Sequence, residues 1–384
     1  MGKIAPGPDA SDVVNPIASY GNKDFLRACE RAAVLRAGDG QPPIPAVNVV
    51  CAPLAQYCLL GMLCAGMEAG SAAKQELSKA LFLENFGTED PESKMQDFFH
   101  LVSENISESR GMHMHASLWV DGVLPEFEKT LQSFWAEVCH LRDYTVVNRL
   151  VSGHTQGMIP NLLSRNHHAF LFLAVNCYKG VWREMLDPGD TYIVEFVGYP
   201  GGPDQTASFM YTKRKMQFAS FEYSQAVLKP YDDNFVAVFV KPTIATERGM
   251  RDAIYEVCSK GSYMLDVLSE EPMRLMSLSM PKLKLRYTSD LEENCRALGI
   301  TSIFETKSMG MALEAEYNGL VSAMPVHVYM EMDEKGTSFA AAAAAGGTRG
   351  GGPPSFVLNH PFVLCLFHAT SKTPLMLAQI HSVV

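Results

Sequence analysis

The chain contains few cysteines for its length and no motif of the common enzyme classes. Nine cysteines among 384 residues are too few for a disulfide framework, and an odd number cannot pair completely. The sequence has no P-loop, no G-x-G-x-x-G turn after a strand, no G-x-S-x-G nucleophile and no H-E-x-x-H zinc motif. We therefore expect reduced, mostly buried thiols, no enzymatic activity, no cofactor and no metal.

Basic residues are also in deficit. The chain has 32 Lys and Arg against 42 Asp and Glu, a formal net charge of −10. A nucleic acid would be repelled unless a local basic patch reversed the field. The nearest approach to such a patch, residues 213–215, is interpreted as a solvated strand or turn. The charge therefore argues against a nucleic-acid partner.

Long uninterrupted apolar runs are missing. The most lipid-like stretch, residues 46–67, is broken by Asn48, Pro53 and Gln56, and is better explained as a buried strand entering a buried helix. The amino terminus lacks the apolar core of a secretory signal. We expect a monomer that is cytoplasmic or secreted by a non-classical route, with no membrane partner.

The remaining composition supports a large folded core. Hydrophobic residues make up 47% of the chain and charged residues 19%. Outside a loosely ordered segment, residues 1–20, periodicity predicts a helix over residues 25–35, a long helix followed by a second one within residues 53–83, and helices over residues 125–139 and 290–298. It predicts strands over residues 48–52, 112–120, 169–177, 227–228, 235–240, 277–285, 321–332 and 362–367. This irregular order predicts an α+β fold with large sheets. The length allows two or three ordinary domains or one large one.

One segment, residues 336–354, consists almost entirely of small residues. Composition alone favours a flexible tether. The segment lies between two predicted strands, however, and so long a loop within one fold calls for a function. Arg349 is its one charged residue after Gly336, and an exposed Arg349–Gly350 bond would suit a trypsin-like protease.

Two histidines, His113 and His115, alternate on one predicted strand and could share a face as metal ligands. No cysteine or carboxylate near them in the sequence completes a ligand set. We therefore interpret them as satisfied strand histidines.

Ordered motifs from about residue 48 to the end resemble the serpin family. They comprise the N-x-x-x-x-P entry at residues 48–53, Asn148 with the T-x-G-x-I-x-x-L-L run at residues 155–163, K-G-x-W at residues 179–182, P-x-L-K at residues 281–284, D-L at residues 290–291, L-G-I at residues 298–300, the hinge at residues 331–337, and H-P-F at residues 360–362. One such motif would be weak, but the ordered set is specific.

This resemblance implies a serpin fold in one domain over residues 1–384: three β-sheets, a cap of about nine helices and an exposed reactive-centre loop over residues 336–354. Most serpins are suicide inhibitors of serine proteases. The protease cuts the loop and forms an acyl-enzyme, and the cut loop inserts into the main sheet and distorts the protease. Insertion requires small side chains, as in residues 340–345. The resemblance leaves open, beside the monomer, a polymer in which the loop of one molecule inserts into the sheet of another.

Carried onto this sequence, the resemblance assigns specific residues. The hinge comprises Glu334, Gly336, Thr337, Phe339, Ala340 and Ala341. Loop length places the scissile bond at Arg349–Gly350 or at Gly350–Gly351. We favour Arg349 because a trypsin-like pocket can bind its charge, whereas glycine offers almost no side chain.

Several positions depart from the family pattern. Phe339 stands where inhibitory hinges carry alanine. Ala52 and Ala55 replace two serines that control sheet opening, at the site called the shutter. His327 lies one residue after the matching histidine position, so that polar network is expected to be absent. Trp182 retains the family tryptophan beside the hinge, at the site called the breach. A non-inhibitory serpin, acting as a binding or storage protein or as a simple protease substrate, is the alternative.

Overall fold

The computed structural model describes residues 15–36, 47–109, 111–140, 143–163, 170–199, 205–307, 309–321, 324–336 and 354–383. Within these ranges lie nine α-helices: α1 (Pro16–Arg36), α2 (Pro53–Gly66), α3 (Ala72–Ala80), α4 (Pro91–Ser107), α5 (Pro125–Gln132), α6 (Tyr144–His154), α7 (Glu247–Lys260), α8 (Ser262–Glu270) and α9 (Leu291–Ala297). Three short 3-10 helices cover Leu83–Phe86, Pro188–Asp190 and Ser302–Phe304.

The strands form three hydrogen-bonded sheets. The largest has the order β1-β14-β13-β8-β7-β6-β9-β12, with β5 also paired to β6. Its members are β1 (Val49–Cys51), β5 (Tyr192–Phe196), β6 (Gln205–Ser220), β7 (Ser224–Pro230), β8 (Phe235–Pro242), β9 (Arg274–Pro281), β12 (Ser355–Val357), β13 (Phe362–His368) and β14 (Thr373–Ile380). The second sheet is β3 (Ala136–Cys139), β2 (Met112–Trp119) and β4 (Leu171–Tyr178), and the third is β10 (Leu283–Asp290) and β11 (Pro325–Met332). The predicted α+β class with three sheets is confirmed.

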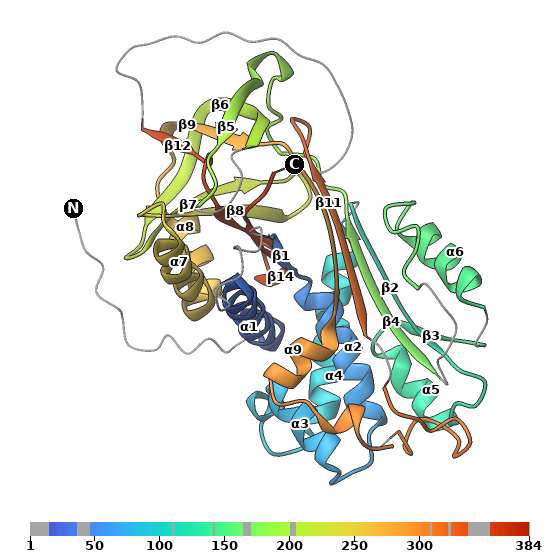
Figure 1. The fold of residues 1–384 in the computed structure, drawn as a ribbon. Coiled ribbons are helices and arrows are strands. Elements are labelled where there is room, and N and C mark those ends of the chain that lie inside the picture. Colours follow the sequence, from blue (N-terminus) through green and yellow to red (C-terminus); the bar gives the residue numbers. More distant parts are fainter. Residues whose placement is uncertain are drawn as a thin grey trace.

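The helices cover the sheets in groups (Figure 1). Helices α1, α7 and α8 pack against the large sheet through a shared apolar cluster with strands β7, β8 and β13. Helices α2, α3, α4 and α9 gather at the opposite end of the molecule (Figure 1). Helix α6 lies on the β2–β4 sheet, where Val147 and Val151 join a cluster with Leu173 and Val175. The β2–β4 sheet is therefore covered by α6 on one face and faces the main core on the other.

Helix α2 shows how the sequence positions the core. Pro53 occupies its first turn, where a missing N–H costs nothing, and nearly every residue of the helix is buried. A helix that is apolar all round can only be an interior helix. It packs against β4 and β14, and its residues line one side of the cavity between β4 and β11.

Several sequence-based boundaries were wrong. Helix α1 begins at Pro16, so residues 16–20 are helical rather than loosely ordered. The helix predicted for residues 125–139 ends at Gln132, because Trp135 adopts a left-handed φ of 53° and residues 136–139 form β3. The strand predicted for residues 277–285 is two strands, since the chain passes from the β6 ladder to the β11 ladder at Lys282. The strand predicted from residue 321 begins at Pro325.

All nine cysteines lie in the described residues, where none forms a disulfide and seven are buried. Burial raises the pKa of Cys365 to about 12 and that of Cys64 to about 11. These thiols act as small apolar core groups. Among the described helices, none has the length and apolar character needed to cross a bilayer. The single-domain organisation over the whole chain stays a prediction.

Candidate functional site: the hinge and the gap beside it

The structure describes only part of the predicted site. Thr337, Phe339, Ala340, Ala341, Arg349, Gly350 and Gly351 lie outside the described residues. The chain is described up to Gly336 and again from Pro354. At the second point, β12 pairs in parallel with β9, and the Ser277 amide donates to the Pro354 carbonyl at 3.0 Å. Both ends of the predicted reactive loop are thus fixed to sheets.

The chain reverses direction at the predicted hinge. After β11, the Asp333 amide donates to the Gly336 carbonyl at 2.7 Å, and the Gly336 amide donates back to the Asp333 carbonyl at 3.3 Å. The Asp333 carboxylate also accepts from the amides of Lys335 and Gly336. On its other side, Gly336 forms an antiparallel bridge with Val181, just beyond β4. Gly336 therefore lies between the ends of β4 and β11 and runs antiparallel to both.

Only glycine fits this position. Gly336 has a φ of 145°, a conformation that L side chains rarely adopt. A Cβ atom there would lie 2.2 Å from the Gly180 carbonyl oxygen and 2.8 Å from the Val181 Cα. The close approach of the hinge to the end of β4 therefore requires the absence of a side chain.

Trp182 anchors the turn from the β4 side. Its indole is buried and donates from Nε1 to the Asp333 carbonyl at 3.0 Å, while its amide donates to the Lys335 carbonyl at 2.8 Å. The ring stacks on Tyr231 with centroids 4.1 Å apart. The structure therefore brings the predicted Trp182 and Gly336 together in one contact network.

A buried lysine lies on the same indole. The Lys229 ammonium is 4.8 Å from the Trp182 ring centroid and donates to the Glu184 carbonyl at 3.0 Å. Burial lowers the pKa of Lys229 to about 8, even though Glu184 favours the charged form. Sequence reasoning missed Lys229 and Tyr231, because both come from the β7–β8 hairpin and no local pattern links them to Trp182.

Glu334 holds the outside of the turn. Its carboxylate accepts from Lys282 at 2.7 Å and from the Thr191 hydroxyl at 2.6 Å, and its carbonyl accepts from the Leu186 amide. Burial alone would raise the pKa of Glu334, but the hydrogen bonds from Lys282 and Thr191 outweigh it and lower the pKa. The predicted hinge acid is therefore a structural anchor that is stable when ionised.

This pKa shift predicts a pH-dependent stability. A carboxyl whose folded pKa lies below its ordinary value of 4.5 stabilises the fold above that pH and loses the contribution as the pH falls through the folded pKa. We expect Glu334→Gln to melt below the unsubstituted protein at pH 7 and the difference to shrink towards pH 3. The exposed pair of Glu126 with Lys129 supplies the control, Glu126→Gln, which should melt like the unsubstituted protein. A Glu334→Gln deficit that is constant with pH would contradict this assignment.

Below the hinge, strands β4 and β11 belong to different ladders. Strand β4 pairs with β2, and β11 pairs with β10, but no ladder joins β4 to β11 within the described part of the chain. A cavity of about 70 Å³ lies between them. Its lining includes residues of both strands, of α2 and of the segment after α6: Ala52, Ala55, Leu59, Ile159, Leu162, Leu173, Val175, His327 and Tyr329. The β2–β4 sheet and the β10–β11 sheet are therefore separated by a gap below Gly336.

The structure brings three predicted shutter residues together at this cavity. Ala52 and Ala55 contribute only methyl groups, and Ala52 provides no side-chain cap for α2. Burial lowers the pKa of His327, although a hydrogen bond to the Leu162 backbone partly opposes this. The side-chain oxygen of Gln56 is buried without a hydrogen-bond partner in the residues that the structure describes. The gap is thus lined mainly by apolar groups.

Two asparagines of the sequence motifs, Asn148 and Asn48, each hold a second segment of backbone in place. Asn148 on α6 donates to the Leu163 carbonyl and accepts from the amides of Leu162 and Leu163, each at 2.8 Å. In the same way, Asn48 donates to the Ser382 carbonyl and accepts from the amides of His381 and Ser382. Each side chain satisfies backbone groups that no regular element pairs. The first holds the segment after α6 over the cavity.

Known proteins share this sequence pattern. The family model described as Serpin (serine protease inhibitor) matches residues 40–383. A serine protease inhibitor of Mus musculus is 23% identical over 384 residues, which cover 94% of this chain and 83% of that protein. Glia-derived nexin of Rattus norvegicus is 26% identical over 247 residues, 61% of either chain.

Solved structures share the architecture. The native thermophilic serpin tengpin superposes with a TM-score of 0.78 at 17% identity and covers 100% of this chain and 97% of its own. Human thyroxine-binding globulin in complex with its ligand gives a TM-score of 0.78 at 16% identity, covering 97% and 99%. Mouse protein-Z dependent protease inhibitor gives 0.76 at 18% identity, covering 97% and 100%. At such identities the likeness shows the fold alone.

Proposed function

The chain belongs to the serpin family, whose members are mostly protease inhibitors, and we propose that it is a suicide inhibitor of a trypsin-like serine protease. One observation carries this proposal. Gly336 already lies between the ends of β4 and β11, antiparallel to both, above a gap that no ladder closes among the described residues. A strand that continued from Gly336 in the same direction would enter this gap.

The proposed reaction begins at Arg349. The serine oxygen of the protease bonds to the Arg349 carbonyl carbon, the bond to the Gly350 nitrogen breaks, and Gly350 leaves as a free amine. Residues 337–349 then insert as a new strand with the protease still attached as an ester. Thirteen residues at about 3.3 Å each would carry the protease about 40 Å from the hinge. Distortion of the protease before water reaches the ester would complete the inhibition.

Arginine sets the proposed specificity. An extended loop that presents Arg349 offers a guanidinium to a protease pocket with a carboxylate at its base. The small residues that precede it, Ala340 to Ala345, would enter the space between β4 and β11 without overpacking it. We propose that this protein acts in the cytoplasm or after non-classical export, where such a protease is present.

Incubation with trypsin tests this function. We expect a covalent complex that survives denaturing electrophoresis, and we expect Arg349→Ala to form at least about tenfold less of it, because the charge partner of the pocket is lost. Arg248→Ala is the matched control, since the Arg248 side chain is 90% exposed on α7, remote from the hinge.

Clean cleavage without a complex would refute inhibition and favour the non-inhibitory alternative, a binding or storage protein or a protease substrate. Mass spectrometry of the released peptide identifies the bond that is cut. A cut between Gly350 and Gly351 would move the reactive bond by one residue.

A further inference from the structure

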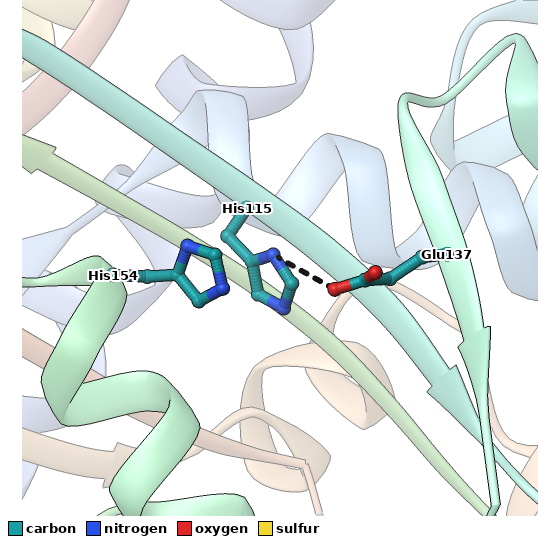
Figure 2. Close-up of side chains that lie close together, drawn as sticks. All are labelled: His115, Glu137 and His154. Carbon is teal, nitrogen blue, oxygen red and sulfur yellow. Dashed lines mark ion pairs between the residues drawn. The ribbon is translucent and has the colours of Figure 1, made fainter.

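Three side chains that could bind a metal meet on the outer face of the β2–β4 sheet (Figure 2). His115, Glu137 and His154 each offer one ligand atom, and these atoms all lie within 4.8 Å of one another. His115 Nδ1 is 3.7 Å from a Glu137 carboxylate oxygen. The His115 and His154 rings lie face to face with centroids 3.8 Å apart. Glu137 is not close to His115 in the sequence, and the pairing of β3 with β2 brings its carboxylate there.

The fold explains the meeting of residues that are distant in sequence. Strand β3 pairs in parallel with β2 so that Glu137 lies opposite Ser117, which places it diagonally across from His115 on the same face. Helix α6 covers this face and ends at His154. His113 shares the face, as predicted, but bonds to Gln156 instead. Three separate elements therefore contribute one candidate ligand each.

His115 has the character of a ligand rather than of a structural core residue. Its side chain is only 7% exposed, and its Nε2 is buried with no hydrogen-bond partner among the described residues. A buried polar atom without a partner is costly in a protein interior.

We propose that His115, Glu137 and His154 form a binding site for a zinc ion. Two imidazoles and one carboxylate are a common protein ligand set for Zn²⁺, with water in the fourth position. Imidazole donors favour Zn²⁺ over Mg²⁺ or Ca²⁺, which prefer oxygen. The carboxyl end of α6, where His154 lies, carries the negative end of the helix dipole and favours a cation.

Binding requires only modest rearrangement. Tetrahedral ligation at about 2.0–2.1 Å needs the donor atoms closer than they are and the stacked rings turned toward one ion. His154 and Glu137 are both exposed, so their side chains can turn, while His115 is fixed in the sheet. The ion would then join α6 to β2 and β3.

A zinc titration of the untagged intact protein tests the site. Calorimetry at neutral pH should give one ion per chain, with a Kd on the order of 10 µM, as expected for three protein ligands on a partly exposed face. His154→Gln and Glu137→Gln should each weaken binding by at least about tenfold. Both positions are exposed, so these variants are expected to fold. Zinc should also raise the melting temperature of the unsubstituted protein but not of His154→Gln.

A matched control separates this site from adventitious binding. His140 is exposed and has a carboxylate beside it, with Nδ1 3.3 Å from Asp121, but no third candidate ligand meets it among the described residues. His140→Gln should bind zinc like the unsubstituted protein, and Ca²⁺ or Mg²⁺ should produce no heat. No zinc binding up to about 100 µM, roughly tenfold above the expected Kd, or equal binding by all variants, would overturn the proposal.

Zinc should also favour cleavage of the loop over trapping of the protease, a consequence that rests on the proposed inhibitory function. Ile159 and Leu162, which follow His154, line the cavity between β4 and β11, so a strand entering there must displace their segment. An ion that ties His154 to the sheet opposes that movement. With trypsin, zinc should lower the share of covalent complex for the unsubstituted protein and not for His154→Gln. A protein that binds zinc but never traps trypsin would refute the inhibitory function and leave the site standing.

Discussion

Gly336→Ala is expected to convert the protein from a trap for trypsin into a substrate. The added Cβ would lie 2.2 Å from the Gly180 carbonyl oxygen, and the φ of 145° is strained for any L side chain. Such strain costs about 1–3 kcal/mol. Gly336, from which the inserting strand continues, would lose its place beside Val181. Insertion would then slow, while hydrolysis of the acyl-enzyme would continue.

The partition between trapping and cleavage measures this effect. Each 1.4 kcal/mol on the insertion barrier changes its rate about tenfold, so denaturing gels should show mostly cleaved protein for Gly336→Ala. Gly153→Ala is the matched control, because a Cβ at Gly153 meets no atom within 4 Å and the residue has no positive φ. As much complex from Gly336→Ala as from the unsubstituted protein would contradict the role assigned to the hinge.

Trp182→Ala is expected to produce the largest loss of stability of the intact protein. The substitution empties a buried site, removes the stacking on Tyr231 and leaves the Asp333 carbonyl without its indole donor. Replacing a buried tryptophan by alanine costs about 3–5 kcal/mol. It would also leave the Lys229 ammonium over a cavity instead of a ring.

A second substitution separates packing from hydrogen bonding. Trp182→Phe keeps an aromatic ring on Tyr231 but loses the Nε1 donor, so it should cost about 1–2 kcal/mol, from the lost hydrogen bond to the Asp333 carbonyl and from the smaller ring. The melting temperatures should therefore rank the unsubstituted protein above Trp182→Phe and Trp182→Ala lowest. Equal melting of Trp182→Ala and the unsubstituted protein would show that the indole does not hold the hinge.

The resemblance to serpins assigned the hinge residues, and local sequence patterns located most of the helices and strands. Gly336 and Trp182 stand in motifs of fixed order, and the structure gives the physical reason for each: a backbone approach that excludes a side chain, and an indole that satisfies a carbonyl. Alternation and apolar runs also predicted β2, β4 and the β7–β8 hairpin. The strands were predictable because their patterns depend on residues close together in the chain, whereas the contacts of Gly336 and Trp182 join segments distant in sequence.

Features that depend on register were not predictable in the same way. The contact of Glu137 with His115 requires the β2–β3 pairing, and strand β3 is too short to show a period of its own. The stack of Trp182 on Tyr231 joins two segments distant in sequence without a local signal. The opening between β4 and β11 likewise depends on how the β2–β4 and β10–β11 sheets lie beside each other, and no single strand predicts it. Such contacts are set by how the sheets assemble.

The measurement that tests the central claim most directly is the melting temperature of the protein after a catalytic amount of trypsin has cut the loop. If the cut segment continues from Gly336 into the gap between β4 and β11, the cleaved protein gains a central strand and its hydrogen bonds. It should then melt well above the intact protein, and Gly336→Ala should gain less. A cleaved protein that melts at or below the temperature of the intact one would contradict loop insertion.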